Sequence, residues 1–350
     1  MTELPHGKSE SPEFVQTSTA AAMTLKLFPG RFYRGAKLKA LNLLLTYNDG
    51  CKANCSYCGL SRSRKINEQT FIRVDWPTFA LDEVISRSNL HGINLERVCV
   101  SMVTHRRAYN DMLSIVKRFR DETNLRISTL IAPTLIKDRE MIERIKAEGA
   151  DMCGIAVDCA TPELFKALRG KGVKGPHIWE HYWKVVKDAA SVFGIYNVSV
   201  HLVVGLGETE KEMLGAIQKA YTLGAEAHLF SFYPEAGSAM ENHPRPGIGS
   251  YRRIQLGRYF IHRGYASFDD FAFDDKEQVK SFGVPEKVIE EIIDGGNAFM
   301  TSGCRGNGSE VACNRPYGNE RPSEKLRNYP FMPNIEDKKD IREQLLDYSF

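Results

Sequence analysis

The sequence has no apolar run of about 18 residues, so it predicts no transmembrane helix and no membrane association. Its first residues, MTELPHGKSESPEF, are polar and contain no apolar signal segment, and we therefore expect a cytoplasmic protein. Eight cysteines in 350 residues are too few for a disulfide scaffold. Neither sign of charge dominates, because 47 Lys and Arg against 44 Asp and Glu leave a net charge of +3. That balance excludes a strongly basic nucleic-acid binder.

The composition is typical of a globular protein. Hydrophobic residues make up 42% of the chain and charged residues 26%, which excludes disorder across the whole length. The length fits two average domains or one barrel with extensions. Residues 1–17, rich in Ser, Glu, Pro and Thr, are predicted to form a disordered arm. We expect a helical or extended lead-in over 18–40, a barrel over 41–303 and a C-terminal extension over 304–350.

From Leu41 onward, short apolar runs alternate with amphipathic stretches, which predicts βαβ units and a parallel sheet. The candidate strands are Leu41–Tyr47, Arg97–Val103, Arg126–Ile131, Met152–Asp158, Val198–Val204, His228–Tyr233, Phe268–Phe273 and Ala298–Ser302. The candidate helices are Met112–Glu122, Arg139–Ala147, Pro176–Phe193, Glu210–Leu223 and Tyr251–His262. Eight mostly continuous apolar strands favour an α/β fold with a TIM-type (β/α)8 barrel. The presence of only five strong helices also allows a barrel that is partly open.

The placement of the cysteines points to one end of that barrel. Active sites of such barrels lie at the carboxyl ends of the strands. Cys51, Cys55 and Cys58 begin four residues after the first candidate strand, and Cys304 follows the eighth. Strands one and eight are neighbours in a closed barrel, so we expect both cysteine groups to face the same mouth.

The first group has the spacing C-x3-C-x2-C, in the segment from Cys51 to Cys58. Three thiolates on one short loop can hold three corners of a cubic iron–sulfur cluster and leave the fourth iron open to a substrate. A structural zinc site requires a fourth protein ligand, and no Cys or His follows within the next thirty residues. A disulfide would leave one thiol over. The cluster is therefore favoured, with zinc and inert buried thiols as the alternatives.

This loop, with Tyr57 directly before the third cysteine, resembles the motif of the radical S-adenosylmethionine (SAM) superfamily. The resemblance implies a 4Fe–4S cluster held by Cys51, Cys55 and Cys58, whose open iron is chelated by SAM. It implies that reduction cleaves SAM to a 5′-deoxyadenosyl radical, which abstracts hydrogen from an unactivated C–H bond. A low-potential electron donor such as ferredoxin or flavodoxin is the expected partner of that chemistry.

The resemblance also implies cofactor contacts around the fourth strand. Asp158 ends that strand, where contact with a ribose hydroxyl fits, and Glu163 and Arg169 follow it. A guanidinium matches carboxylate geometry, so Arg169 is expected to hold the carboxylate of SAM. The alternatives are helix capping by Thr161 with nearby acids, and an ordinary surface salt bridge for Arg169.

Two further strands carry positions that the resemblance assigns to SAM. Val203 and Gly205 belong to the fifth strand and its Gly-x-Gly-Glu-Thr turn, which in the family follows the strand that packs against adenine. A tight turn capped by Thr209 explains the same residues. After the second strand, the Gly-Gly-Glu stretch found in many members is absent. Ser101 and Thr104 stand there instead and are expected to supply hydroxyl or backbone contacts.

Cys304 and Cys313 form a second cysteine group near the C-terminus. Two thiolates alone cannot complete a four-cysteine site, so further ligands must come from elsewhere, with Cys99, Cys153, a serine, a histidine or an arginine as candidates. We expect this pair to help hold a second, auxiliary 4Fe–4S cluster. A zinc site and a pair of free structural thiols are the alternatives.

Within the biotin synthase and lipoyl synthase-like radical SAM enzymes, the chain resembles one subunit of the two-protein lipoyl synthases. The similar segments are 18–33, 51–58, 168–175 and 304–322. The resemblance implies a sulfurtransferase that inserts sulfur into an octanoyl chain, with the auxiliary cluster sacrificed as the sulfur source. It implies an octanoylated lipoyl carrier protein as substrate and a second, paralogous lipoyl synthase subunit as partner.

Lipoyl carriers are usually acidic, so Arg62, Arg64 and Lys65 are candidates for steering their docking, although a solvated loop explains these residues as well. Three other functions remain open: biotin synthase-like sulfur insertion into another substrate, a carbon-skeleton mutase of the methylornithine synthase type, and a non-catalytic iron–sulfur scaffold.

Overall fold

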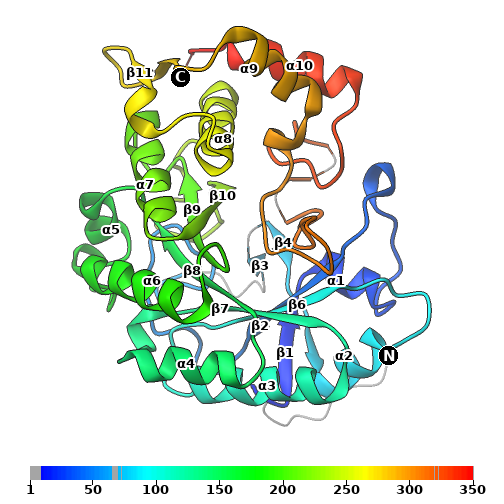
Figure 1. Cartoon of the computed structure of the whole chain (residues 1–350). Coiled ribbons are helices and arrows are strands. Elements are labelled where there is room, and N and C mark those ends of the chain that lie inside the picture. The colour runs from blue at the N-terminus through cyan, green and yellow to red at the C-terminus, as the bar shows by residue number, and fades with distance from the viewer. Residues whose placement is uncertain (1–8, 65–69, 72, 319, 322, 350) are drawn as a thin grey trace.

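The computed structural model describes residues 9–64, 70–71, 73–318, 320–321 and 323–349. Its centre is an eight-stranded sheet with the strand order β10-β9-β8-β7-β6-β2-β1-β5. Figure 1 shows helices along the outer side of this sheet, while the orange and red C-terminal part lies on the other side. Among the described residues, no helix combines the length and the apolar composition needed to span a bilayer.

Six consecutive strands of the sheet are parallel. They are β2 (Ala40–Leu45), β6 (Arg97–Ser101), β7 (Arg126–Ile131), β8 (Met152–Asp158), β9 (Val198–Val204) and β10 (Ala225–Ser231). Parallel neighbours need crossover connections, and helices supply most of these between successive strands. The parallel arrangement brings the carboxyl ends of all six strands to one edge of the sheet.

The helices between the strands are amphipathic. The α-helices are α1 (Thr19–Thr24), α2 (Leu81–Ser88), α3 (Ala108–Glu122), α4 (Arg139–Ala147), α5 (Pro162–Leu168), α6 (Trp179–Phe193), α7 (Glu210–Thr222), α8 (Ile248–Arg263), α9 (Glu286–Gly295) and α10 (Ile335–Leu345). In α3, Met112, Ile115, Val116 and Phe119 are buried, at the spacing of a single helix face. A capping box between Thr209 and Glu212 fixes the start of α7.

The predicted α/β class with a (β/α)8-type, partly open barrel is confirmed. Strands β10 and β5 (Thr78–Ala80) end the sheet order and do not pair with each other. Three candidate strands, β7, β8 and β9, have the predicted bounds, and β2, β6 and β10 lie within three residues of them. Continuous apolar runs therefore identified the six parallel strands.

The seventh and eighth candidate strands were wrong. Phe268–Phe273 forms the 3-10 turn η4 (Phe268–Asp270) and the two-residue β11 (Ala272–Phe273), which pairs only with β12 (Val279–Ser281). A capping box between Ser267 and Asp270 stabilises that turn. Ala298–Ser302 overlaps the turn η5 (Asn297–Phe299), which follows Gly296 with φ of 75°. The other 3-10 turns in the described part of the chain are η1 (Tyr33–Gly35), η2 (Pro133–Leu135) and η3 (Lys171–Val173).

The position beside β2 that an eighth strand was expected to fill belongs to β1 (Phe14–Thr17). This strand pairs antiparallel with both β2 and β5. It corrects the prediction of a disordered arm over 1–17, of which residues 1–8 lie outside the described part. Val15 and Thr17 are buried while Phe14 and Gln16 are partly exposed, so a short alternating pattern inside a polar stretch is enough to join the sheet.

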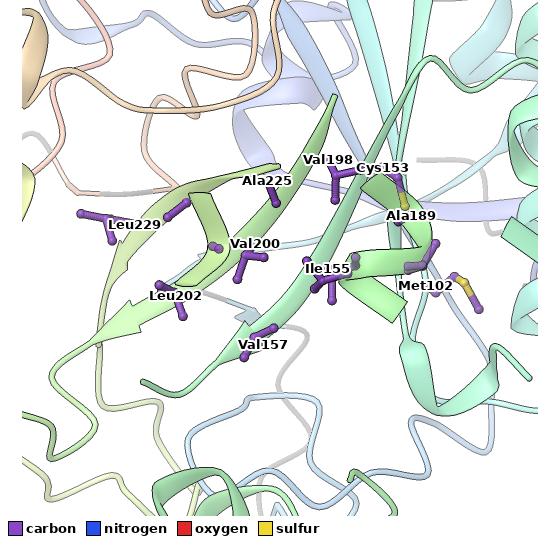
Figure 2. Packing of buried hydrophobic residues seen from close by; sticks show 14 of the residues in the cluster. Met102, Cys153, Ile155, Val157, Ala189, Val198, Val200, Leu202, Ala225 and Leu229 are labelled. Atoms are coloured by element: carbon purple, nitrogen blue, oxygen red, sulfur yellow. The ribbon is translucent and has the colours of Figure 1, made fainter. Parts of the chain in front are cut away.

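The parallel strands present two different faces. Cys153, Ile155 and Val157 of β8 pack with Val198 and other apolar residues on the helix side of the sheet, as Figure 2 shows. Successive side chains of a strand point to opposite faces, so the residues in between point inward. Those inward positions include Asn42, Cys99, Ala156, Asp158, His201, Val203, His228 and Phe230, all of which line a cavity.

The chain after η5 folds back to the amino ends of β2, β6 and β7. Arg97 Nε donates to the carbonyl oxygen of Arg305 at 2.6 Å, and Arg126 Nη1 donates to that of Gly306 at 2.8 Å. Met300 also pairs with Tyr329 in a parallel bridge. Figure 1 shows this orange segment beside β6. It brings Cys304 and Cys313 to the inward face of the sheet without any eighth strand.

Candidate active site

A cavity of about 280 Å³ lies against the inward face of the parallel strands. Six of the eight cysteines line it, three from the loop after β2, one from β6 and two from the C-terminal segment: Cys51, Cys55, Cys58, Cys99, Cys304 and Cys313. The expected convergence of the two cysteine groups is therefore observed. The route differs from the expectation, because a folded-back segment replaces the eighth strand.

Backbone hydrogen bonds hold the Cys51–Cys58 loop in place. The amide of Lys52 donates to the Thr104 carbonyl oxygen at 2.7 Å, and the amide of Ser56 donates to that of Leu168 at 2.8 Å. Within the loop's end, the Leu60 amide donates to Cys58 Sγ at 3.3 Å. The loop is thus tied to the carboxyl ends of β6 and α5, and one amide already points at a sulfur.

Burial raises the pKa of the Cys55 and Cys58 thiols. Both thiols are therefore protonated at neutral pH unless a metal displaces the protons. Arg62 and Arg64, considered as docking residues, donate to backbone carbonyl oxygens of Lys174 (2.8 Å) and Ala236 (2.9 Å). In the structure these two arginines brace the loop, and Lys65 lies outside the described residues.

Tyr57, Asp158 and Arg169 form one contact group next to the loop. The Tyr57 hydroxyl donates to Asp158 Oδ2 at 2.5 Å, and Arg169 Nη1 lies 3.0 Å from the same oxygen. Arg169 Nη1 also donates to the carbonyl oxygens of Ala156 and Val157. Burial opposes charge on Arg169, yet Tyr57 and Asp158 raise its pKa overall. Arg169 is 5% exposed, and its Nε has no hydrogen-bond partner among the described residues.

Of the other predicted cofactor contacts, some line the cavity and some do not. Ser101 and Val203 line the cavity together with Tyr57, Asp158 and Arg169. Glu163 and Gly205 are not among its described lining residues. Glu163 lies in the first turn of α5, whose cap is the Thr161 side chain.

Gly205 has a packing role. Its φ is 101°, and a Cβ atom there would lie 2.6 Å from the Pro246 ring. Only glycine meets both conditions without strain. The amides of Gly205 and Leu206 donate to the Glu208 carboxylate at 2.6 and 2.9 Å, so the Gly-x-Gly-Glu-Thr turn closes on itself.

The sequence model of the radical SAM superfamily matches residues 45–220, which contain the cysteine loop and five of the six parallel strands in whole or in part. The chain belongs to the radical SAM superfamily. Members of this family use a 4Fe–4S cluster and SAM, and three thiols on one anchored loop beside a cavity fit that cofactor pair.

Solved structures similar to this radical SAM chain include methylornithine synthase (PylB), with 17% identity, TM-score 0.48 and coverage of 68% of this chain and 67% of that one. HydG, a maturase of the [FeFe]-hydrogenase, has 15% identity and a TM-score of 0.49. The match covers 69% of this chain and about half (52%) of HydG. Coproporphyrinogen III oxidase (HemN) from Escherichia coli has 14% identity and TM-score 0.43, covering 74% and 60%. No curated protein sequence matches the chain.

The cavity contains functional candidates that sequence reasoning did not single out. His201 and His228 line it from β9 and β10, with ring centroids 5.7 Å apart. Burial, with a smaller effect of Arg315, lowers the pKa of His201 to about 3, so its imidazole is neutral. The signal for both was a polar residue at alternate positions of an apolar strand, as in Val-Ser-Val-His-Leu-Val-Val.

A second buried histidine group stands near the loop. His177 Nδ1 is 2.6 Å from Thr134 Oγ1 and 2.8 Å from the Tyr182 hydroxyl. Burial lowers the pKa of His177 to about 3, and nearby Arg169 adds to this. Among the described residues, no three His, Cys, Asp or Glu side chains are placed to hold one metal ion. In an iron–sulfur cluster, by contrast, each thiolate binds a different iron.

Proposed function

We propose that this radical SAM protein is a sulfurtransferase of the lipoyl synthase type. It inserts sulfur into an octanoyl chain on a lipoyl carrier protein and works with a second, paralogous subunit. The observation that carries the proposal is that two separate cysteine groups line one cavity. One group serves radical generation, and the other holds the sulfur that the substrate receives.

Cys51, Cys55 and Cys58 are the proposed ligands of the SAM-binding cluster. When bound, the reduced cluster and SAM supply hydrogen-atom abstraction from an unactivated carbon. Tyr57, Ser101, Asp158, Arg169 and Val203 line the cavity beside that loop and are the proposed SAM contacts. The Arg169 Nε, buried and without a hydrogen-bond partner, is the atom that a cofactor carboxylate would satisfy.

The rest of the cavity wall suits a saturated acyl chain. Leu44, Met102, Leu130, Ile131 and Phe230 contribute apolar surface, and the neutral His201 adds no charge. Each buried methylene of an octanoyl chain contributes about 0.8 kcal/mol. An apolar wall also excludes water from a reactive carbon.

Cys304 and Cys313 are the proposed holders of the auxiliary cluster that gives up sulfur. A protein-bound substrate would enter on a flexible lysine arm, and the electrons would come from a low-potential donor such as ferredoxin or flavodoxin. The proposed location is the cytoplasm, because thiols and clusters stay reduced there.

The test uses the protein reconstituted anaerobically with iron and sulfide, together with its paralogous subunit, SAM, dithionite and an octanoylated carrier domain. Intact-mass spectrometry should show sulfur replacing hydrogen on the octanoyl group, with 5′-deoxyadenosine as coproduct. An unchanged carrier in the presence of SAM cleavage contradicts the proposal, and a product of rearranged carbon skeleton without sulfur indicates a mutase.

Two cysteine variants sharpen this experiment. Cys304→Ala should still cleave SAM, because the Cys51–Cys58 loop is intact, and should transfer no sulfur. Cys153→Ala is the matched control, since Cys153 is a fully buried thiol that faces the helix side of the sheet. It should retain sulfur transfer.

A further inference from the structure

Three cysteines outside the Cys51–Cys58 loop gather in one part of the cavity wall. Cys99 comes from the inward face of β6, while Cys304 and Cys313 come from the folded-back segment after η5. Their exposed fractions are 9%, 7% and 8%. All three thiols are therefore nearly enclosed yet line the same cavity as the radical SAM loop.

Asn42, Cys99 and Ser128 form a row across three neighbouring strands, and this row lies next to the two C-terminal thiols. Asn42 of β2 stands opposite Cys99, and Cys99 stands opposite Ser128 of β7. Neighbouring parallel strands in register put these three side chains on one face. Asn42 Nδ2 donates to Cys313 Sγ at 3.5 Å. The Ser128 hydroxyl donates to the Val98 carbonyl oxygen at 3.4 Å and lies near both Cys99 and Cys304.

The thiols also influence one another electrostatically. Burial raises the pKa of Cys99 to about 11, and the neighbouring Cys313 adds to that rise. Burial likewise raises the pKa of Cys304, with further contributions from Cys99 and Cys313. Cys99 likewise raises the pKa of Cys153, which packs on the other face of the sheet, so the geometry and not the pKa separates Cys153 from the two C-terminal cysteines.

The remaining two cysteines are placed elsewhere. Cys153, the other candidate from the sequence, packs in the apolar core with Ile155 and Val157, on the face of β8 that does not line the cavity (Figure 2). Cys159 follows β8 and is not among the described lining residues. Three of the cysteines that line the cavity belong to the Cys51–Cys58 loop and three to the second group. Among the described residues, no fourth cysteine lines the cavity to complete the second group.

A buried cation lines the β9 and β10 side of the cavity, two residues after Cys313, and has no ion-pair partner among the described residues. Arg315 is 9% exposed and lines the cavity, and its Nε has no hydrogen-bond partner. Its Nη2 donates to the Ser302 carbonyl oxygen at 3.2 Å, and its guanidinium carbon is 4.1 Å from the Phe230 ring centroid. A buried charge without a partner is costly, so an anionic group is expected near it.

We propose that Cys99, Cys304 and Cys313 supply the three thiolates of a second iron–sulfur cluster, with Arg315 as its buried counter-charge and one iron left without a cysteine ligand. This assignment rests on the proposed auxiliary cluster and adds its third ligand. It separates Cys99 from Cys153, which the sequence alone left equivalent.

The test counts iron and sulfide and records the electron paramagnetic resonance (EPR) spectrum after anaerobic reconstitution of the full-length protein. Wild type should hold about eight irons, Cys99→Ala about four and the matched control Cys153→Ala about eight. The loop cluster that remains in Cys99→Ala reports that the fold survives. Eight irons in Cys99→Ala, or an equal loss in Cys153→Ala, overturns the assignment, as does zinc in place of iron at the second site.

A second variant covers the case in which Cys99→Ala does not fold. Cys99→Ser keeps the side-chain volume and replaces sulfur by oxygen, so the second cluster should be lost or its EPR signal altered. An unchanged spectrum contradicts ligation by Cys99. These readouts need no turnover, so failure of sulfur transfer with the second cluster intact would refute the proposed function alone.

The role of Arg315 has its own readout. Arg315→Met removes the positive charge and should make the reduction potential of the second cluster more negative, whereas Arg315→Lys should retain most of it. Redox titration followed by EPR measures the shift. Equal potentials in wild type and Arg315→Met contradict the counter-charge assignment.

Discussion

A single residue, Asp158, connects strand β8, the cysteine loop and the buried Arg169. It ends β8 with φ of 64°, accepts a hydrogen bond from Tyr57 and forms an ion pair with the buried Arg169. Asn tolerates this left-handed backbone, so Asp158→Asn removes the charge without adding backbone strain. The charge of Arg169 is then uncompensated, and the free energy of unfolding should fall by about 3 kcal/mol. Urea denaturation of the protein measures this change.

The matched control is Asp121→Asn, because Asp121 pairs with Lys117 and Arg120 on an exposed helix surface. Its loss should change the free energy of unfolding by less than about 0.5 kcal/mol. If Asp158→Asn costs as little as the control, the contact group of Tyr57, Asp158 and Arg169 does not stabilise the loop.

Single residues also show what the sequence can predict. The spacing of Cys51, Cys55 and Cys58 predicts a cluster loop because ligand spacing within eight residues is a local property. The contacts of Tyr57 with Asp158, and of Cys313 with Asn42, join positions about 100 and 271 residues apart. No local pattern encodes such pairs, and only the sheet register brings them together.

Among the elements, a buried acid joins the C-terminal segment to Arg73 and to Arg245 in the loop before α8. The Glu320 side chain is fully buried, and its carboxylate lies 3.0 Å from Arg73 Nη1 and 2.9 Å from Arg245 Nη2. Glu320→Gln removes the carboxylate that pairs with the buried Arg73 and leaves Arg245 with Glu324 alone. We expect amide hydrogen exchange across 300–330 to accelerate at least about tenfold, because the segment opens more often. Exchange followed by mass spectrometry measures it.

The control for that experiment is Glu324→Gln. Glu324 bonds the same Arg245 at 2.6 Å, but its side chain is 24% exposed, so water replaces the lost contact. Similar exchange rates in both variants would contradict the role of Glu320 as a fastener. If Cys304 and Cys313 hold the proposed second cluster, Glu320→Gln should lose the iron of that cluster before the iron at the Cys51–Cys58 loop.

The central strands of the sheet could be predicted from the sequence, whereas the strands at its edge could not. Strands β7, β8 and β9 are buried over most of their length and are rich in apolar residues, so their bounds are clear in the sequence. β1 has only four residues and depends on pairing with β2 and β5, which no local signal shows. The seventh and eighth candidates contain apolar residues, but a capped turn begins the seventh and a turn after Gly296 overlaps the eighth.

For the whole molecule, the buried neutral histidines predict sensitivity to acid. His177 has its pKa lowered to about 3 by burial, whereas the unfolded chain has an ordinary histidine pKa near 6.5. Between these values the unfolded state binds a proton that the folded state does not. The free energy of unfolding therefore falls as pH drops below about 6.5, by up to about 1.4 kcal/mol per pH unit for this residue.

Replacing His177 by Gln should flatten that dependence. Urea denaturation at pH 7 and pH 5 compares wild type, His177→Gln and the control His91→Gln, whose side chain is exposed. The loss of stability between the two pH values should be smaller in His177→Gln and unchanged in His91→Gln. An equal loss in all three proteins would contradict the buried, neutral state of His177.

The proposed sulfur insertion requires two clusters in one cavity, and the most direct measurement removes one of them. The variant Cys51→Ala/Cys55→Ala/Cys58→Ala is reconstituted anaerobically, and its iron, sulfide and EPR spectrum are measured. About four irons should remain as an intact cluster held by Cys99, Cys304 and Cys313. A folded protein without iron would contradict the proposal, since the chain would then hold a single cluster and no store of sulfur.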